Sequence, residues 1–349
     1  MTEKERLFRV IAGQSVDRPP CICPGGMMNM ITTDVMDLAG VFWPEAHTDA
    51  EMMAALAAAG YENGCFENVG VPFCMTVEAE MLGAEVTMGT GIYEPHVTGY
   101  AINSVEEWRN LKPANLESGR VQTVIQAIRL LKARNLPAPV IGNLTGPIST
   151  ASSLMEPVDF YKQLRKKNKE AHEFMNFVTE QMIHFVRMQL EAGADIIAVS
   201  DPSGTGEILG PRMFEEFAVK YLNQIVEAVH QENKPVIIHI CGQMKNVYPQ
   251  LRQLKSDVLS FDSIVPMSEA RKNLPNRVLM GNVSTYALEF GNPEKIIKLT
   301  EHCVKNGSNI VSPACGLGTR SPLKNIQTMV SYLKGTASAG EQVKETKEA

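Results

Sequence analysis

The stretch GADIIAVSDPSGTGEILGPRMFEEFAVKYLNQIVEAVHQENKPVIIHIC, residues 193–241, decides the fold class of this chain. It begins and ends with apolar runs, 193–201 and 234–241, and the segment between them, 211–232, carries apolar residues at helical spacing. The two runs are largely apolar rather than alternating, which is typical of strands covered on both faces. The stretch therefore predicts a strand, a crossover helix and a second, parallel strand.

The same unit recurs along the chain. Six further apolar runs predict strands at 18–23, 66–72, 137–144, 256–262, 277–283 and 308–315. Helical patterns between runs include 158–191, as one helix or two, and 293–306, which opens with a proline. About eight such alternations predict a closed (β/α)8 barrel, a TIM barrel. The alternative is an open doubly wound sheet, but the loop after the first strand, PGGMMNM at 24–30, lacks the G-x-G-x-x-G spacing that such sheets use.

The chain is longer than a minimal barrel requires. It has 349 residues, whereas a (β/α)8 barrel needs roughly 250. We therefore predict one catalytic domain over residues 1–335, with helical additions at the N-terminus and a hairpin excursion near 77–101, where strand-like pairs alternate with glycines. The small and charged residues at 336–349 predict a disordered tail.

Composition narrows the class of protein. The 33 basic and 39 acidic residues give a net charge of −6, which argues against a nucleic-acid partner. The sequence has no apolar run near the roughly 18 residues of a membrane span, and its start, MTEKERLF, lacks the apolar stretch of a signal peptide. We therefore expect a cytoplasmic protein without a membrane partner, in which the seven cysteines are reduced.

Reactive side chains in a parallel barrel lie at the carboxyl ends of its strands. The polar residues at these ends are Asn143, Asp201, His239, Cys241, Asp262, Asn282 and Cys315. His239 and Cys241 are two residues apart, so both point to one face of a strand. With Cys315 they form a His, Cys, Cys set that leaves a fourth position open, as in catalytic zinc sites. The alternatives are that the cysteines are simply apolar core, or that Cys21 and Cys23 compete as ligands.

Two aspartates and a methionine-rich loop are further candidates. Asp262 and Asp201 are candidate catalytic residues that could act as a general acid or base, or support His239; for Asp201 a helix cap is the alternative. Met27 and Met28 follow the first strand and could line a rim that fits a broad, flat ligand, with gap-filling in the core as the alternative.

Several motifs resemble a known family. The opening RLFRVIAGQSVDRPP looks like the start of the uroporphyrinogen decarboxylase superfamily. The segments that resemble its cobamide-dependent methyltransferase branch are FWPEAHTDAEMMAALA (42–57), VPFCMTVEAEMLGAEVTMGT (71–90), AGADIIAVSDP (192–202), HICG (239–242), MGNVS (280–284) and PACGL (313–317). The resemblance covers about residues 3–335, and HICG and PACG are its specific motifs.

The resemblance implies a (β/α)8 barrel with zinc held by His239, Cys241 and Cys315. It also implies a partner protein that carries a corrinoid and docks over the barrel mouth, where we assign Met27, Met28, Asn143 and Asn282 as candidate cofactor-binding residues. The expected reaction is methyl transfer between this corrinoid and a small substrate, either a thiol such as coenzyme M or a methoxylated or otherwise methylated donor.

The alternative is a decarboxylase that acts on a carboxylated substrate. True uroporphyrinogen decarboxylases carry two arginines after the first strand, in a motif like P-x-W-x-M-R-Q-A-G-R. This chain has PPCICPGGMMNM at 19–30, without an arginine. A substrate with eight carboxylates needs such cations, so their absence argues against uroporphyrinogen.

Overall fold

Six parallel strands form the central sheet of the computed structural model, which describes the backbone of residues 1–345 and the side chains of residues 1–335. The strands, in their order across the sheet, are β1 (Val69–Val71), β4 (Val140–Thr145), β5 (Ile196–Ser200), β6 (Val236–Ile240), β7 (Val258–Phe261) and β8 (Val278–Met280). Every residue of β4, β5, β6 and β7 is buried. The largely apolar runs therefore predicted covered parallel strands correctly.

Two more strand segments close the sheet into a ring. Ile310 bridges to Met280 of β8, and its neighbour Val311 bridges in parallel to Cys21, in the predicted first strand. The first segment lies beside residues 67 and 68, because the backbone N–H of Glu67 donates to the Cys21 carbonyl at 2.9 Å. Strand order thus runs through eight positions and back to the start, and the predicted (β/α)8 barrel is confirmed.

The first strand makes single bridges rather than a regular ladder. Pro19, Pro20 and Pro24 have no N–H to donate to a ladder. Side chains supply the missing bonds: a Glu67 carboxylate oxygen accepts from the Cys21 N–H at 2.8 Å, and the Asn68 amide bonds both the N–H and the carbonyl of Cys23.

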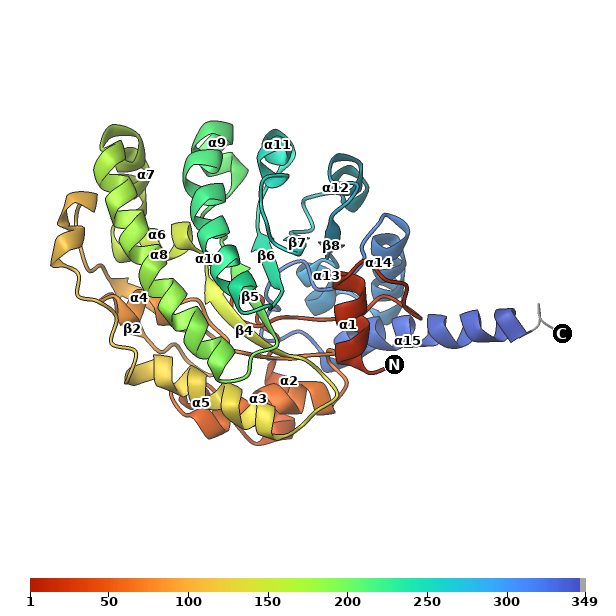
Figure 1. Cartoon of the computed structure of the whole chain (residues 1–349). Coiled ribbons are helices and arrows are strands. Elements are labelled where there is room, and N and C mark those ends of the chain that lie inside the picture. The colour runs from red at the N-terminus through yellow and green to blue at the C-terminus, as the bar shows by residue number, and fades with distance from the viewer. Residues whose placement is uncertain (346–349) are drawn as a thin grey trace.

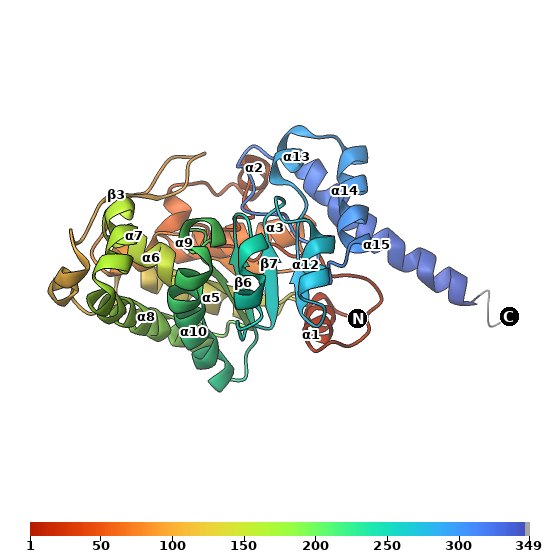
Figure 2. The ribbon, with the colours of Figure 1, turned by 90° about the horizontal axis from the view of Figure 1, so that it is seen from above.

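Helices surround the strands in Figures 1 and 2, with α8 and α10 at one flank of the molecule and α14 at the other. The helices are α1 (Glu3–Ile11), α2 (Thr33–Ala39), α3 (Ala50–Glu62), α4 (Val77–Met81), α5 (Gly119–Ala133), α6 (Pro147–Leu154), α7 (Pro157–Lys166), α8 (Asn168–Glu191), α9 (Gly206–Met213), α10 (Lys220–Gln231), α11 (Tyr248–Leu251), α12 (Met267–Asn273), α13 (Thr285–Phe290), α14 (Pro293–Lys305) and α15 (Leu323–Glu345). Shorter 3₁₀ turns are η1 (Glu45–His47), η2 (Val105–Asn110) and η4 (Lys245–Val247), and η3 (Phe214–Val219) is a π-helical turn. The predicted pattern at 158–191 is two helices, α7 and α8, and α14 begins at its proline as expected.

The predicted hairpin excursion is present. Strands β2 (Glu85–Thr87) and β3 (His96–Gly99) pair antiparallel within the 77–101 segment. The loop that joins them returns to the barrel, because the Thr319 hydroxyl donates to the Ile92 carbonyl at 3.0 Å. The hairpin therefore places its loop beside the chain that follows Cys315.

The predicted domain boundary and the predicted tail are not tested by the described residues. The division into a domain at 1–335 and a disordered tail at 336–349 stays a prediction. The backbone of residues 336–345 continues helix α15, whereas residues 346–349 and the side chains from 336 onward lie outside the described residues. Within the described residues, no helix is both long and apolar enough to cross a membrane.

Candidate metal centre

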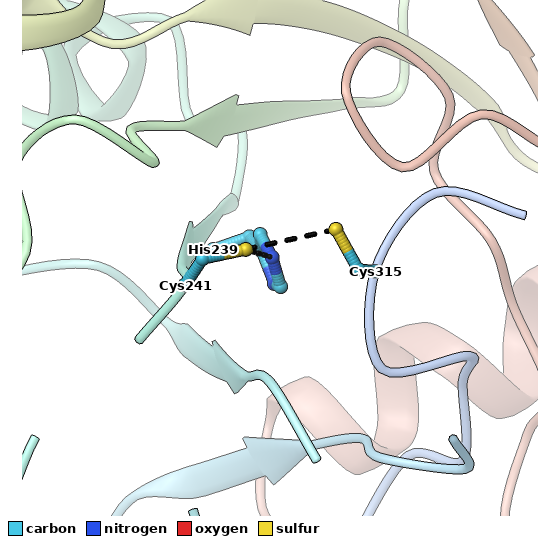
Figure 3. A group of neighbouring side chains, drawn as sticks. All are labelled: His239, Cys241 and Cys315. Carbon is cyan, nitrogen blue, oxygen red and sulfur yellow. Dashed lines mark hydrogen bonds between the residues drawn. The ribbon is translucent and has the colours of Figure 1, made fainter. Parts of the chain in front are cut away.

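His239, Cys241 and Cys315 meet at the carboxyl end of the barrel strands. His239 is the fourth residue of β6, Cys241 follows the last residue of that strand, and Cys315 follows the eighth strand segment. Figure 3 shows the pair from β6 facing Cys315 on a separate loop. One ligand atom from each residue lies within 4.8 Å of the other two. The structure thus brings together, from positions 74 residues apart, the three side chains that the strand ends predict.

The spacing of these three atoms fits a tetrahedral ion. Nε2 of His239 lies 3.2 Å from Sγ of Cys241, and the two sulfurs lie 3.6 Å apart. Zinc bonds of about 2.0–2.3 Å place tetrahedral ligand atoms roughly 3.3–3.8 Å from one another. An imidazole with two thiolates is also a donor set that zinc prefers over magnesium or calcium. The two printed spacings are therefore compatible with a metal ion such as zinc bound by these three side chains.

Ser260 of β7 orients the imidazole. Its Oγ lies 2.9 Å from Nδ1 of His239, and both side chains are 1% exposed. The two residues are paired in register across β6 and β7. When the hydroxyl accepts from Nδ1–H, the lone pair of Nε2 is left free for a metal, which is the usual arrangement of a ligating histidine.

The pKa values of Cys241 and Cys315 are shifted in opposite directions. The pKa of Cys315 is lowered, chiefly because the Cys241 thiol donates to its sulfur and further because His239 bonds to it. The same hydrogen bond, together with burial and the nearby Asp262 charge, raises the pKa of Cys241. The hydrogen bond between the two sulfurs thus lowers the pKa of Cys315 and raises that of Cys241.

Asp262 lies next to the triad, and Asn282 supports it. Asp262 directly follows β7, is half-buried, and accepts from the Ile264 N–H at 2.9 Å. The Asn282 amide donates to the carbonyls of Asp262 and Val265 at 2.9 and 2.8 Å. The amide N–H groups of Asn282 thus hold the turn that carries Asp262, so the structure favours a supporting role over the predicted contact with a cofactor.

The Asp201 side chain caps a helix, while its backbone N–H donates to the carbonyl of His239 at 2.9 Å. Its carboxylate is fully buried and accepts from the Ile148 N–H, the Ser149 N–H and the Ser149 hydroxyl, at 3.2, 2.8 and 2.7 Å. These donors belong to the first turn of α6, the first helix after β4, rather than to the helix after β5. Burial raises the pKa of Asp201, and the bonds from Ser149 and Ile148 oppose this. Of the two readings, this geometry favours capping.

Asn143 and Met28, two of the candidate cofactor-binding residues, are buried in the structure. The Asn143 amide donates to the carbonyls of Pro24 and Val71 at 2.8 and 3.2 Å, and its side chain is 2% exposed. Met28 is also buried, with its sulfur 4.0 Å from Ser260 Oγ, and Met27 is half-buried. Met28 thus lies against Ser260, the residue bonded to His239, and of the two methionines only Met27 has exposed surface to offer a ligand.

The competing cysteine pair does not join the triad. Cys21 and Cys23 are fully buried, and the Cys23 thiol donates to the Met28 carbonyl at 3.1 Å. Burial raises the pKa of both thiols well above its usual value. Both cysteines therefore fit the core reading.

Sequence reasoning did not identify Ser260 or Glu94. Ser260 could have been found from the strand alignment, since it lies two residues before Asp262 on the strand beside His239. Glu94 belongs to the hairpin loop, and burial and the neighbouring Cys315 raise its pKa to about 8. Glu94 precedes Cys315 by 221 positions, and no sequence pattern around Glu94 indicates that the two residues lie side by side.

A cavity of about 570 Å³ lies at the opposite end of the barrel. Its lining includes residues 13–19 before the first strand, residues 275–278 at the start of β8, and residues 308 and 309. These are the amino ends of the strands, whereas barrel enzymes react at the carboxyl ends. The cavity is therefore separate from the triad.

Comparisons with known proteins identify the family and support the fold. The sequence model of the uroporphyrinogen decarboxylase family matches residues 2–336. A methylcobamide:CoM methyltransferase, MtbA of Methanosarcina acetivorans, is 32% identical over 335 residues, which are 95% of this chain and 98% of that protein. A solved methyltransferase from Methanosarcina mazei superposes with a TM-score of 0.89 at 29% identity, covering 96% of this chain and 99% of the other. A uroporphyrinogen decarboxylase of Hordeum vulgare is 30% identical over only 72% of this chain and 77% of its own.

Proposed function

Because the chain belongs to the uroporphyrinogen decarboxylase family and is a methyltransferase, we propose that it moves a methyl group between a corrinoid protein and a small substrate at a zinc site. The observation that carries this proposal is the His, Cys, Cys set with ligand spacing suited to zinc and a fourth position open. We take a thiol such as coenzyme M as the preferred substrate, since the relative of Methanosarcina acetivorans is named for it. A methoxylated or methylated donor is the second candidate, which the same ligands serve.

Each ligand residue has a defined task in this proposal. Nε2 of His239 and the sulfurs of Cys241 and Cys315 hold the ion, while Ser260 keeps the imidazole in the tautomer that exposes Nε2. When bound, zinc keeps a substrate thiol ionised near neutral pH, or polarises an ether oxygen in the demethylation case. The two thiolates offset the charge of the dication, so a substrate thiolate stays electron-rich enough to attack a methyl group.

The proton of the substrate thiol needs an acceptor. Asp262 is half-buried and close enough to raise the pKa of Cys241, whereas Asp201 is buried with its carboxylate occupied by α6. We therefore assign proton acceptance to Asp262 and helix capping to Asp201. Glu94, whose pKa is raised to about 8, is a second carboxyl group beside Cys315.

The first experiment is metal analysis of the purified protein. We expect stoichiometric zinc in the wild type and its loss in Cys241→Ala. The matched control is Cys65→Ala, which removes a fully buried thiol outside the triad and should keep the metal. Equal zinc in Cys241→Ala and the wild type would contradict the site.

The second experiment tests the reaction. Methylcobalamin, free or bound to a corrinoid protein, is mixed with a small thiol, and cob(I)alamin spectra and a thioether are the expected products. Failure with thiols and methoxy-aromatics alike, together with release of carbon dioxide from a carboxylic acid, would favour the decarboxylase alternative.

A further inference from the structure

The turn that carries Cys241 is anchored from a neighbouring helix. Ile240 is the last residue of β6, so Cys241 and Gly242 lie beyond the ladder. The next residue, Gln243, donates its backbone N–H to Oε1 of Glu207 at 2.5 Å. Glu207 belongs to the first turn of α9, the first helix after β5. A side chain from a different element thus ties down the backbone two residues beyond a ligand cysteine.

Glu207 is itself held in place by the start of α9. The Thr205 hydroxyl caps this helix by accepting from the N–H groups of Glu207 and Ile208 at 3.1 and 3.3 Å. The same helical turn packs tightly against the chain after Cys241, since a Cβ added at Gly206 would lie 2.7 Å from a Val247 methyl. The Glu207 carboxylate therefore extends from a capped and closely packed helix start.

The turn needs such an anchor because of its glycine. Gly242 has a φ of +82°, a conformation that glycine adopts without strain and that leaves the chain flexible. A charge-assisted bond to the next N–H limits the freedom of the turn. The bond thereby fixes the backbone on the C-terminal side of Cys241, whose sulfur lies 3.2 Å from Nε2 of His239.

We infer that Glu207 is a positioning residue that holds the Cys241 turn in the geometry required for zinc. The inference rests on the proposed zinc site, and it concerns the hydrogen bond to Gln243 rather than the charge of the carboxylate. Groups that orient metal ligands in this way typically change metal affinity by about 10–100-fold when they are removed. Glu207 is exposed, so we expect the lower end of that range, a loss of about 10-fold.

The test compares Glu207→Ala with Glu207→Gln by competition for zinc with a chromogenic chelator. Alanine removes the acceptor, whereas the amide oxygen of glutamine can still accept from Gln243, so only Glu207→Ala should weaken zinc binding. Glu207→Asp keeps the charge but shortens the reach and should also weaken it. The matched control is Glu227→Ala, which removes an exposed carboxylate paired with Lys255, away from the turn.

A second readout does not depend on metal. Hydrogen–deuterium exchange of the metal-free protein should become faster in the peptide containing residues 241–243 in Glu207→Ala, and unchanged in Glu207→Gln and Glu227→Ala. The melting temperature of the metal-free protein should stay near the wild-type value in all variants. If the wild type binds no zinc but the variants still differ in exchange in this way, the proposed metal centre is overturned. The anchoring of the turn by Glu207 would remain supported.

Three outcomes would overturn the inference. If Glu207→Ala and Glu227→Ala have equal zinc affinity and equal exchange, the hydrogen bond from Gln243 to Glu207 does not position the Cys241 turn. Equal losses in Glu207→Gln and Glu207→Ala would assign the effect to charge. A large drop in the melting temperature of metal-free Glu207→Ala, with Glu207→Asp affected in the same way, would make the role merely structural.

Discussion

Ser260→Ala tests how the metal ligands are oriented. In the wild type the Ser260 hydroxyl lies 2.9 Å from Nδ1 of His239 in a position that is 1% exposed. Without it, the metal-free imidazole can reverse its tautomer and donate from Nε2 to the Cys241 sulfur, 3.2 Å away. Zinc would then have to reverse that tautomer before binding.

The magnitude follows from the cost of one buried hydrogen bond. A neutral bond contributes about 0.5–1.5 kcal/mol, and a buried donor left without a partner costs roughly 1–3 kcal/mol. Taking about 1.4 kcal/mol as the difference between the metal-free and bound states, zinc affinity should fall about 10-fold. Chelator competition at fixed pH measures this value, and the melting temperature of the metal-free protein checks that the fold is kept.

Ser200→Ala is the matched control for this variant. Ser200 is 3% exposed and paired in register with His239 from the other neighbouring strand, β5, and it makes no hydrogen bond to the triad within the described residues. Its loss should leave zinc affinity unchanged. An unchanged or tighter affinity in Ser260→Ala would refute the reasoning, because it would mean that Ser260 donates to Nδ1 and that Nε2 already carries the proton.

Three further variants probe other parts of the molecule. Cys315→Ser should keep the circular dichroism spectrum but lose most zinc by metal analysis, and stoichiometric zinc would contradict its assignment. Asp262→Asn should lower kcat/KM by about 10–100-fold and change zinc affinity less, with isothermal calorimetry in buffers of different ionisation enthalpy counting about one proton released per bound thiol; a count near zero with ether demethylation would exclude thiolate formation. His47 packs on Trp43 with both ring nitrogens unpartnered within the described residues, and burial, with a smaller effect of Arg120, lowers its pKa to about 3. Only the unfolded state takes up its proton between about pH 6.5 and 3, so the free energy of unfolding should fall by about 1.4 kcal/mol per pH unit as the pH drops through this window. Urea titrations should show that His47→Phe removes this slope, and an unchanged slope would place the protonation elsewhere.

The sequence by itself determined the barrel and the members of the triad. Strands buried on both faces must be apolar on both faces, so runs such as 234–241 are visible without a structure. His239 and Cys241 share a face because side chains alternate along any strand. Cys315 joins them because every strand of a parallel barrel ends at the same rim. These features depend on local periodicity and on the topology of the fold, both of which the sequence carries.

Only the tertiary structure decided what the remaining polar residues do. Asp201 and Asp262 both follow a strand, yet Asp201 turns to the start of α6 and Asp262 lies beside Cys241. Glu94 and Glu207 reach the site from a hairpin loop and from a helix start, where no periodicity marks them. A side chain at a strand end can turn toward the mouth or toward a neighbouring helix, and the choice depends on which hydrogen-bond donors lie there. Those donors come from segments distant in the sequence, so their positions exist only once the chain has folded.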